Sequence, residues 1–244
     1  SLGNVLSVAE VLSVYQPEVL RYLFAGTRPN AEFAISFDLD VIKIYEDYDR
    51  SERAFFGSEE LGADRRAREA RIYELSQVDA VPAKLPFQIP FRHLTTYLLV
   101  AEGDLDVALN AMPGYSAAAD DQDFSRRARA RAACAWHWLE NHAPEEFRWQ
   151  LADPNEPPVE MPEPLRDLVP QLLERGIPLI EQGADADLHQ LFYEVSRGAE
   201  QDPKDFFRWL YQALIHRDRG PRLAAFLVTL GSDRVRRILE RYAS

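Results

Sequence analysis

The chain has 244 residues, of which 46% are hydrophobic, and a formal net charge of −12 at pH 7. This composition excludes a disordered chain, and the length allows a sizeable core in one or two domains. The single cysteine, Cys134, excludes an internal disulfide and a cysteine-based zinc site. No apolar run approaches the roughly 20 residues that cross a bilayer, so we expect a cytoplasmic protein with no membrane partner.

The negative charge is unevenly distributed along the chain. Residues 203–244 contain nine Lys and Arg against four Asp and Glu, a net charge of +5, so residues 1–202 carry −17. Phosphate contacts need Lys and Arg, and an acidic body with a basic C-terminal segment can bind RNA locally. The residues alone favour another interpretation, in which these arginines form a solvated helix face.

Sequence patterns typical of helices occupy the N-terminal third of the chain. They predict helices at residues 7–15, 17–26, 38–57 and 64–77. Ser7 and Glu10 have the spacing of a capping box, and Asp38 is a good N-cap for the third helix. Tyr45 and Tyr48 fall on its apolar stripe, so we interpret them as core rather than as a platform for stacked bases. The fourth helix is strongly charged and is expected at the surface.

Prolines divide the rest of the chain. Three prolines between residues 82 and 90 place the main boundary between residues 84 and 85, and five between 154 and 164 indicate a linker at about 152–164 between two lobes. Helices are predicted at residues 91–101, 105–112, 123–141, 165–175, 187–199, 203–216, 221–230 and 233–242. Gly220 and Gly231 are expected to terminate helices. The prediction is an all-α fold, with any strand as short as residues 147–151.

Signatures of catalysis are scarce. The five histidines are scattered without the spacing that places two ligands on one helix face, so no metal site is predicted. Cys134 is interpreted as buried packing, and Trp209 as core. What remains is recognition chemistry, because arginines bind phosphates and arginine or aromatic planes stack on unpaired bases. The candidates for such contacts are Arg208, Tyr211, Arg217, Arg219 and Arg222.

Several motifs, in their order along the chain, resemble one family. They are YQPEVLRYLF at 15–24, FDLDVIKIYEDYDR at 37–50, PFRHL at 90–94, HAPEEF at 142–147 and GPRL at 220–223. The ordered set is similar to class I lysyl-tRNA synthetases over essentially the whole chain. The opening Ser-x-Gly-Asn is similar to the end of the family's KMSKS loop, so we expect a fragment that begins there.

The resemblance implies a function for the intact protein. Such an enzyme attaches lysine to tRNA(Lys) with ATP and Mg, and the fragment, which lacks the catalytic domain, is expected to hold no cofactor and to be inactive alone. Residues 1–84 would include a helical domain that contacts the tRNA stem, and residues 85–244 an α-helical cage for the anticodon. Ser1, Gly3 and Asn4 would be remnants of the ATP loop.

The resemblance also extends the set of tRNA-binding candidates. These additional residues are Arg50, Arg53, Arg92 and His93. For Arg50 and Arg53, pairing with carboxylates on the same helix is an equally good interpretation. Two other functions stay open, namely the equivalent part of a glutamyl-tRNA synthetase and a helical adaptor that binds proteins and no RNA. Steep salt dependence of RNA binding would separate a synthetase from an adaptor.

Overall fold

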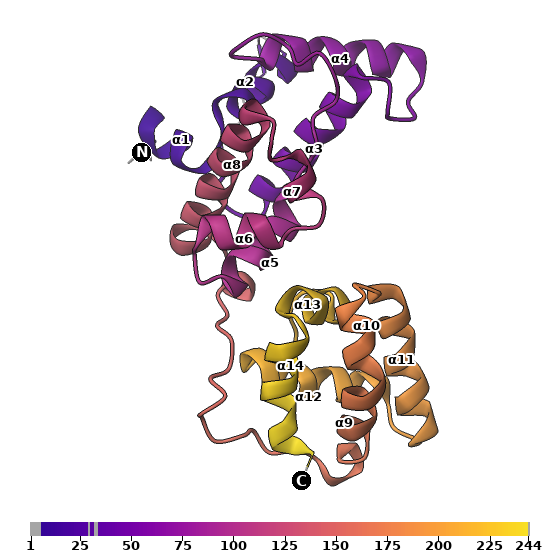
Figure 1. Ribbon diagram of the computed structural model, residues 1–244. Helices are drawn as coiled ribbons and strands as arrows, with labels where there is room; N and C mark the ends of the chain where they lie inside the picture. Colours follow the sequence, from indigo (N-terminus) through magenta and orange to yellow (C-terminus); the bar gives the residue numbers. More distant parts are fainter. Residues whose placement is uncertain (1–5, 29, 32–33, 244) are drawn as a thin grey trace. The chain divides into compact units, whose positions relative to one another are not determined.

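The computed structural model describes residues 6–28, 30–31 and 34–243, and all regular structure within these ranges is helical (Figure 1). The predicted all-α fold is confirmed. Residues 148–151 have no regular secondary structure in the described part, and residue 147 belongs to a 3-10 turn, so the short strand considered at 147–151 is not formed. The chain divides into two compact units, Ser1–Pro144 (unit 1) and Glu145–Ser244 (unit 2).

Unit 1 contains the helices α1 to α8. Their bounds are α1 Val8–Val14, α2 Pro17–Gly26, α3 Asp40–Phe55, α4 Ala63–Ser76, α5 Phe91–Val100, α6 Leu105–Ala111, α7 Tyr115–Ala118 and α8 Gln122–Asn141. The local sequence explains why several of these helices begin where they do. The predicted capping box is formed, because Glu10 N donates to Ser7 Oγ and Ser7 N donates to Glu10 Oε2. Asp38 accepts from Asp40 N, so it caps α3 from two residues before the helix begins.

Aromatic side chains make the centre of unit 1. Tyr45 and Tyr48 of α3 are almost completely buried, which confirms that they are core. The Tyr45 ring stacks on Phe91 of α5 at 4.2 Å between centroids, and Phe91 meets Trp138 of α8 edge-on at 5.9 Å. The Tyr45 hydroxyl donates to the Val14 carbonyl at 3.0 Å. Trp138 Nε1 donates to the Phe37 carbonyl at 2.8 Å. This stack joins α3, α5 and α8, and both of its polar side-chain groups are satisfied.

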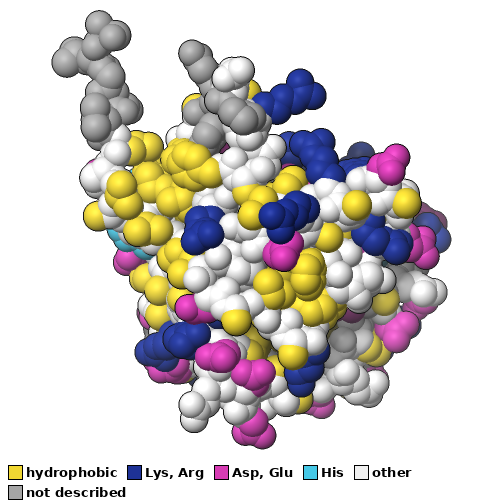
Figure 2. Space-filling view, turned by 90° about the horizontal axis from the view of Figure 1, so that it is seen from above, with side chains coloured by type: hydrophobic (Ala, Val, Ile, Leu, Met, Phe, Trp, Pro, Cys, Tyr) yellow, Lys and Arg dark blue, Asp and Glu magenta, His cyan; other side chains and the backbone are white. Residues whose placement is uncertain are grey.

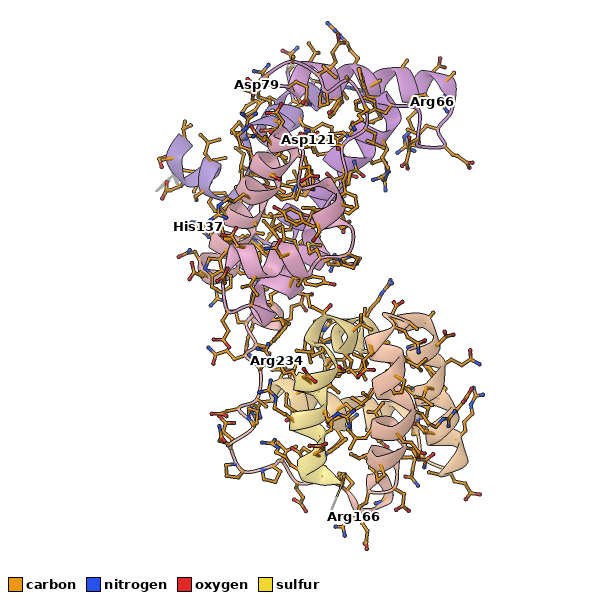
Figure 3. All side chains as sticks on the ribbon, viewed as in Figure 1. Arg66, Asp79, Asp121, His137, Arg166 and Arg234 are labelled. Carbon is orange, nitrogen blue, oxygen red and sulfur yellow. The ribbon has the colours of Figure 1, made fainter. Side chains whose placement is uncertain are left out.

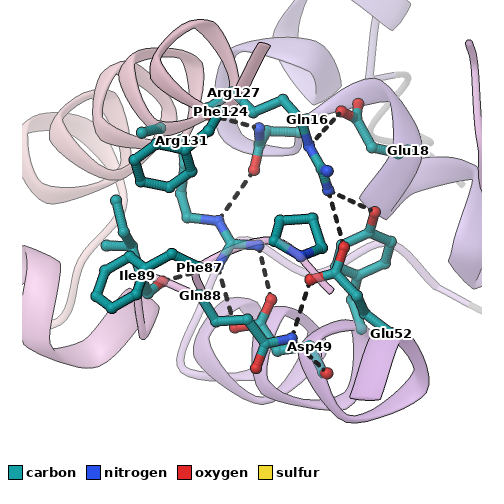
Figure 4. Close-up of a pocket in the computed structure, with 13 residues that line it drawn as sticks. Gln16, Glu18, Asp49, Glu52, Phe87, Gln88, Ile89, Phe124, Arg127 and Arg131 are labelled. Carbon is teal, nitrogen blue, oxygen red and sulfur yellow. Dashed lines mark hydrogen bonds and ion pairs between the residues drawn. The ribbon is translucent and has the colours of Figure 1, made fainter. Parts of the chain in front are cut away.

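A buried ion pair lies beside the aromatic stack (Figure 4). Arg131 of α8 donates to both carboxylate oxygens of Asp49 on α3, at 2.7 and 3.0 Å, to the Ile89 carbonyl at 2.7 Å and to Gln16 Oε1 at 3.1 Å. Burial raises the pKa of the Asp49 carboxyl, and the Arg131 guanidinium opposes that shift. One guanidinium therefore connects four segments of unit 1.

A second buried carboxylate extends this network. Glu52 accepts from the Tyr73 hydroxyl of α4 at 2.8 Å, from Gln88 Nε2 at 2.9 Å and from Arg127 of α8 at 3.1 Å. Gln88 also donates to the Asp49 carbonyl at 2.8 Å. The pocket that these side chains line has a volume of about 30 Å³, room for no more than a water molecule or two. The network is structural, with no space for a metabolite.

The position of residues 82–90 follows from these bonds. Through Gln88 and Ile89 this proline-rich segment is bonded to α3 and α8. The predicted boundary at residues 84/85 thus falls inside unit 1, and the division of the chain comes after Pro144. Prolines correctly indicate an extended segment here, but they do not show that its polar groups bond to both neighbouring helices.

Unit 2 contains the helices α9 to α14, three short 3-10 helices and one π-helical turn in its described part. Their bounds are η1 Glu145–Phe147, η2 Glu163–Leu165, α9 Leu168–Gln171, η3 Leu172–Gly176, α10 Ile177–Glu181, α11 Asp185–Gly198, α12 Pro203–Ile215, α13 Leu223–Leu230, α14 Ser232–Leu239 and η4 Glu240–Tyr242. Trp209 is buried against Phe206 and Tyr242, which confirms it as core. The predicted linker at 152–164 also belongs to unit 2.

The predicted linker is held by the end of the chain. Arg241 donates to the carbonyls of Asp153, Pro154 and Glu156, each at 3.0 Å. The Tyr242 hydroxyl accepts from the backbone N–H of residue 159 at 3.0 Å. The prolines remove backbone donors from this segment, and side chains of the C-terminal turn satisfy its carbonyls instead.

One helix end and one helix terminator differ from the prediction. The helix predicted to end at residue 175 continues through a π-helical turn, Leu172–Gly176, into α10. Pro178 explains the wider turn, because it has no N–H to offer the carbonyl four residues earlier. The helix α12 ends at Ile215 and is capped by His216, which adopts a left-handed conformation with φ +55°. The predicted bounds 203–216 are thus confirmed within one residue, but His216 rather than Gly220 terminates the helix.

Removal of Arg131 should destabilise unit 1 strongly. The change Arg131→Ala leaves the Asp49 carboxylate buried and unpaired, at an expected cost of roughly 3–5 kcal/mol of unfolding free energy. Denaturant-dependent hydrogen exchange of α3 and α8 measures this. Arg129→Ala is the matched control on the same helix, since Arg129 pairs with Asp106 at the surface and such a pair contributes ~0–1 kcal/mol. Equal effects of the two changes would contradict the prediction.

Candidate nucleic-acid interface

The loop between α12 and α13, residues 216–222, carries three of the predicted arginines in a fixed shape. The Tyr211 hydroxyl of α12 donates to the Pro221 carbonyl and closes the loop. A Cβ at Gly220 would lie 2.8 Å from Ile215 Cδ1 and 3.1 Å from the Tyr211 ring, so no larger residue fits without a shift. At the start of the loop, His216 Nε2 lies 3.2 Å from a carboxylate oxygen of Glu156.

Arg217 is turned toward the start of unit 2. Its guanidinium donates to Glu145 Oε1 and to the Arg148 carbonyl, both at 2.9 Å. The neighbouring Asp218 accepts from Gln212 Nε2 at 2.7 Å. Arg217 thus joins the loop to η1, and 72 residues separate it from its partner Glu145.

The other predicted arginines of this region make fewer contacts within the protein than Arg217. Arg219 and Arg222 are exposed, and neither has a carboxylate within 4 Å among the residues that the structure describes. Arg222 stands directly before α13, whose first turn has no side-chain cap. Arg208 lies one turn before Tyr211 on α12 and pairs with Asp205 at 3.6 Å, in a surface pair of little strength.

The stem-contact candidates of α3 are already engaged. Arg50 lies 3.3 Å from Asp47 and 3.6 Å from Glu59, and Arg53 lies 2.8 Å from Glu59 and donates to Gln88 Oε1 at 2.7 Å. Carboxylate pairing, the competing interpretation, is therefore present. Arg50 pairs with Asp47 one turn earlier on the helix and with Glu59, whereas the partner of Arg53 is Glu59 in the following loop. Arg53 also stabilises the position of the segment that contains Gln88.

The remaining candidates are dispersed. Arg92 on α5 lies 3.5 Å from Glu46 of α3 and is more than half exposed, and its neighbour His93 is exposed. Ser1, Gly3 and Asn4 lie outside the described residues. Within the described ranges, no helix is long and apolar enough to cross a membrane, and no group of three His, Cys, Asp or Glu is arranged to hold a metal ion.

Comparison with known proteins identifies the family. A family model described as "tRNA synthetases class I (K)" matches residues 1–79. The chain is 38% identical to the lysine–tRNA ligase of Borrelia garinii, over 99% of this chain and 46% of the relative. It is 42% identical to that of Treponema pallidum, over 99% and 45%. The chain belongs to the class I lysyl-tRNA synthetases and matches their C-terminal portion.

Archaeal members of this family are also similar. The lysine–tRNA ligase of Thermococcus kodakarensis is 29% identical over 96% of this chain and 44% of its own length. The chain thus spans about half the length of the curated class I lysyl-tRNA synthetases that it matches.

Tyr211→Phe tests whether the hydroxyl holds the loop. Loss of its bond to the Pro221 carbonyl should lower the unfolding free energy of unit 2 by about 1 kcal/mol, measured by denaturant unfolding. Burial raises the pKa of Tyr211 to about 12. The unfolded chain therefore loses this proton first, and the stability due to Tyr211 should fall as the pH rises from about 10. The difference in stability between the original chain and the variant should shrink over that range; a constant difference would contradict this.

Proposed function

We propose that this chain is the tRNA-binding part of a class I lysine–tRNA ligase that attaches lysine to tRNA(Lys), with ATP, accompanied by Mg, as a substrate of the whole enzyme. The observation that carries the proposal is a fixed loop with exposed arginines in the basic segment of an acidic chain. Lysine and ATP would bind mainly to the half of the relatives' length that this chain does not match.

The loop 216–222 has the properties of an anticodon contact. Arg219 and Arg222 offer planar guanidinium groups that can bind phosphate through two parallel hydrogen bonds or stack on an unpaired base. Because the loop is fixed by Tyr211 and Arg217, little conformational freedom is lost on binding. The −17 charge of residues 1–202 repels RNA elsewhere, so contact is favoured at basic surfaces.

The structure suggests different roles for the other candidates in this region. Arg217 would act as a positioning residue through Glu145 and the Arg148 carbonyl. Arg208 can exchange its weak surface pair for a phosphate. Tyr211 uses its hydroxyl within the loop, so any contact with a base would involve its ring. These assignments refine the expectation that the whole cluster meets the anticodon arm.

Alanine variants of the exposed arginines test the proposal. If Arg219 or Arg222 anchors a phosphate, its removal should weaken all tRNAs alike and reduce the salt slope of binding by about one. If it reads a base, the loss should be roughly 1–3 kcal/mol and confined to tRNA(Lys). The control is Arg175→Ala, since Arg175 of unit 2 pairs with Glu194 at 2.7 Å. Unchanged affinity in both Arg219→Ala and Arg222→Ala would contradict the proposed anticodon contact.

The proposed separation between the tRNA-binding part and the ATP site gives a separate prediction. The chain alone should bind tRNA but show no lysine-dependent exchange between pyrophosphate and ATP. Lysyl-adenylate formed by the purified chain would contradict the proposed location of the ATP site. Stronger binding of tRNA(Glu) than of tRNA(Lys) would favour a glutamyl enzyme, and no RNA affinity at any salt concentration would favour an adaptor.

A further inference from the structure

The chain enters unit 2 through residues 145–156, which we call the entry segment. Apart from η1 at its start, this segment has no regular secondary structure (Figure 1), and Figure 3 draws its side chains as sticks. The Ala152 N–H donates to the Leu214 carbonyl in α12 at 2.8 Å. The Trp149 ring is buried and meets Phe226 of α13 edge-on, with 5.1 Å between centroids. The entry segment is therefore fixed to both helices that flank the arginine-bearing loop.

Contacts from both ends of the entry segment reach the loop between α12 and α13. At the start of the segment, Glu145 Oε1 and the Arg148 carbonyl each accept from a different nitrogen of Arg217 at 2.9 Å. At its end, Glu156 Oε2 lies 3.2 Å from His216 Nε2. The first two residues of the loop are thus held by the entry segment, ahead of the two exposed arginines.

The backbone at the start of the loop depends on such contacts. His216 adopts a left-handed conformation with φ +55°, which residues other than glycine adopt rarely and at a cost in free energy. This residue directs the chain out of α12, so its geometry determines where the following arginines lie. Arg217 adds a planar fork that binds two acceptors at once, an arrangement that the single ammonium group of a lysine does not reproduce.

Attraction to RNA does not explain the two carboxylates beside the loop. The side chain of Glu145 is 81% exposed and that of Glu156 is 53% exposed, and an exposed carboxylate repels the phosphates of a nucleic acid. Acidic and basic side chains are mixed on the face of the molecule seen in Figure 2, so a carboxylate near an arginine is not unusual on this protein. These two carboxylates differ from most because both contact the first residues of the loop.

We propose that Glu145 and Glu156 are positioning residues, which hold the loop 216–222 in the shape that presents its two exposed arginines to RNA. The inference rests on the proposed function, because the RNA would be the tRNA that meets this loop. If charge alone mattered, removal of either carboxylate would tighten RNA binding, because a repulsive charge is lost. Positioning predicts the opposite result, namely weaker binding although the chain becomes less negative.

Two adjacent glutamates of η1 provide a matched test. Glu145 is bonded to Arg217, whereas Glu146 is exposed and has no ion pair among the residues that the structure describes. Glu145→Ala should bind tRNA(Lys) roughly threefold to tenfold more weakly, because the loop loses one bond and must be ordered on binding. Glu146→Ala removes the same charge and should bind equally well or more tightly. Glu145→Gln restores an acceptor without the charge and should recover part of the affinity, and Glu156→Ala should weaken binding in the same way as Glu145→Ala.

Arg217→Lys separates positioning from a direct phosphate contact. The lysine keeps the positive charge but does not bridge Glu145 and the Arg148 carbonyl as the guanidinium does. Positioning therefore predicts a loss of tRNA(Lys) affinity similar to that of Glu145→Ala. Affinity equal to that of the original chain would show that the charge of this residue matters and its two-point contact does not, which would overturn the inference.

Hydrogen exchange of the amides in the loop 216–222 gives a readout that does not need RNA. Faster exchange in Glu145→Ala than in Glu146→Ala, at equal unfolding free energy, would support positioning, since an exposed ion pair contributes little to global stability. Equal exchange in the two variants, or tRNA(Lys) binding by Glu145→Ala that is no weaker than by Glu146→Ala, would overturn it. An original chain that binds no RNA would contradict the proposed function, and faster exchange in Glu145→Ala would then still support the fixing of the loop by Glu145.

Discussion

The contact between Arg131 and Asp49 organises unit 1. A buried ion pair gains its stability only when its remaining hydrogen-bonding groups are satisfied, since both charges lose their hydration. Here the guanidinium also donates to the Ile89 carbonyl and to Gln16, so four of its five N–H groups are bonded, two of them to neighbouring segments. This requirement fixes α3 against α8 and holds the extended segment before α5 between them.

The surface chemistry of unit 1 follows from this buried arrangement. Glu52, one turn from Asp49, accepts from the Tyr73 hydroxyl and so fixes α4 against α3. With α3 held in this orientation, Glu59 engages both Arg50 and Arg53. The same packing brings α4 beside α2, where Arg21 of α2 donates to the Leu75 carbonyl of α4 at 3.0 Å. In unit 2, Tyr211 and Arg217 have the corresponding effect on the loop 216–222, because their bonds fix the backbone that presents Arg219 and Arg222.

The sequence predicts the helices well and the pairing of charges poorly. Periodicity and capping residues are local signals, so they predict α2 at 17–26 and place Tyr45 and Trp209 in the core, as the structure has them. Which arginine is free depends on segments far apart in sequence. Nothing near Arg217 indicates that Glu145 lies beside it, and the residue types around Arg53 do not indicate Gln88. The kinds of side chain at a nucleic-acid interface were thus predictable, while their availability required the structure.

The sequence separation within the Arg131 network has a consequence for how the protein folds during synthesis. Gln16 and Arg131 are 115 residues apart, and Asp49 and Arg131 are 82 apart. Contacts that close long loops form late, because the chain entropy is lost before the contact stabilises anything. At a synthesis rate of about 5–20 residues per second, several seconds pass between the synthesis of α3 and α4 and that of α8. During that interval Asp49 and Glu52 stay hydrated. The side of α3 that packs against α8 stays exposed to solvent until this last helix of the unit has been synthesised.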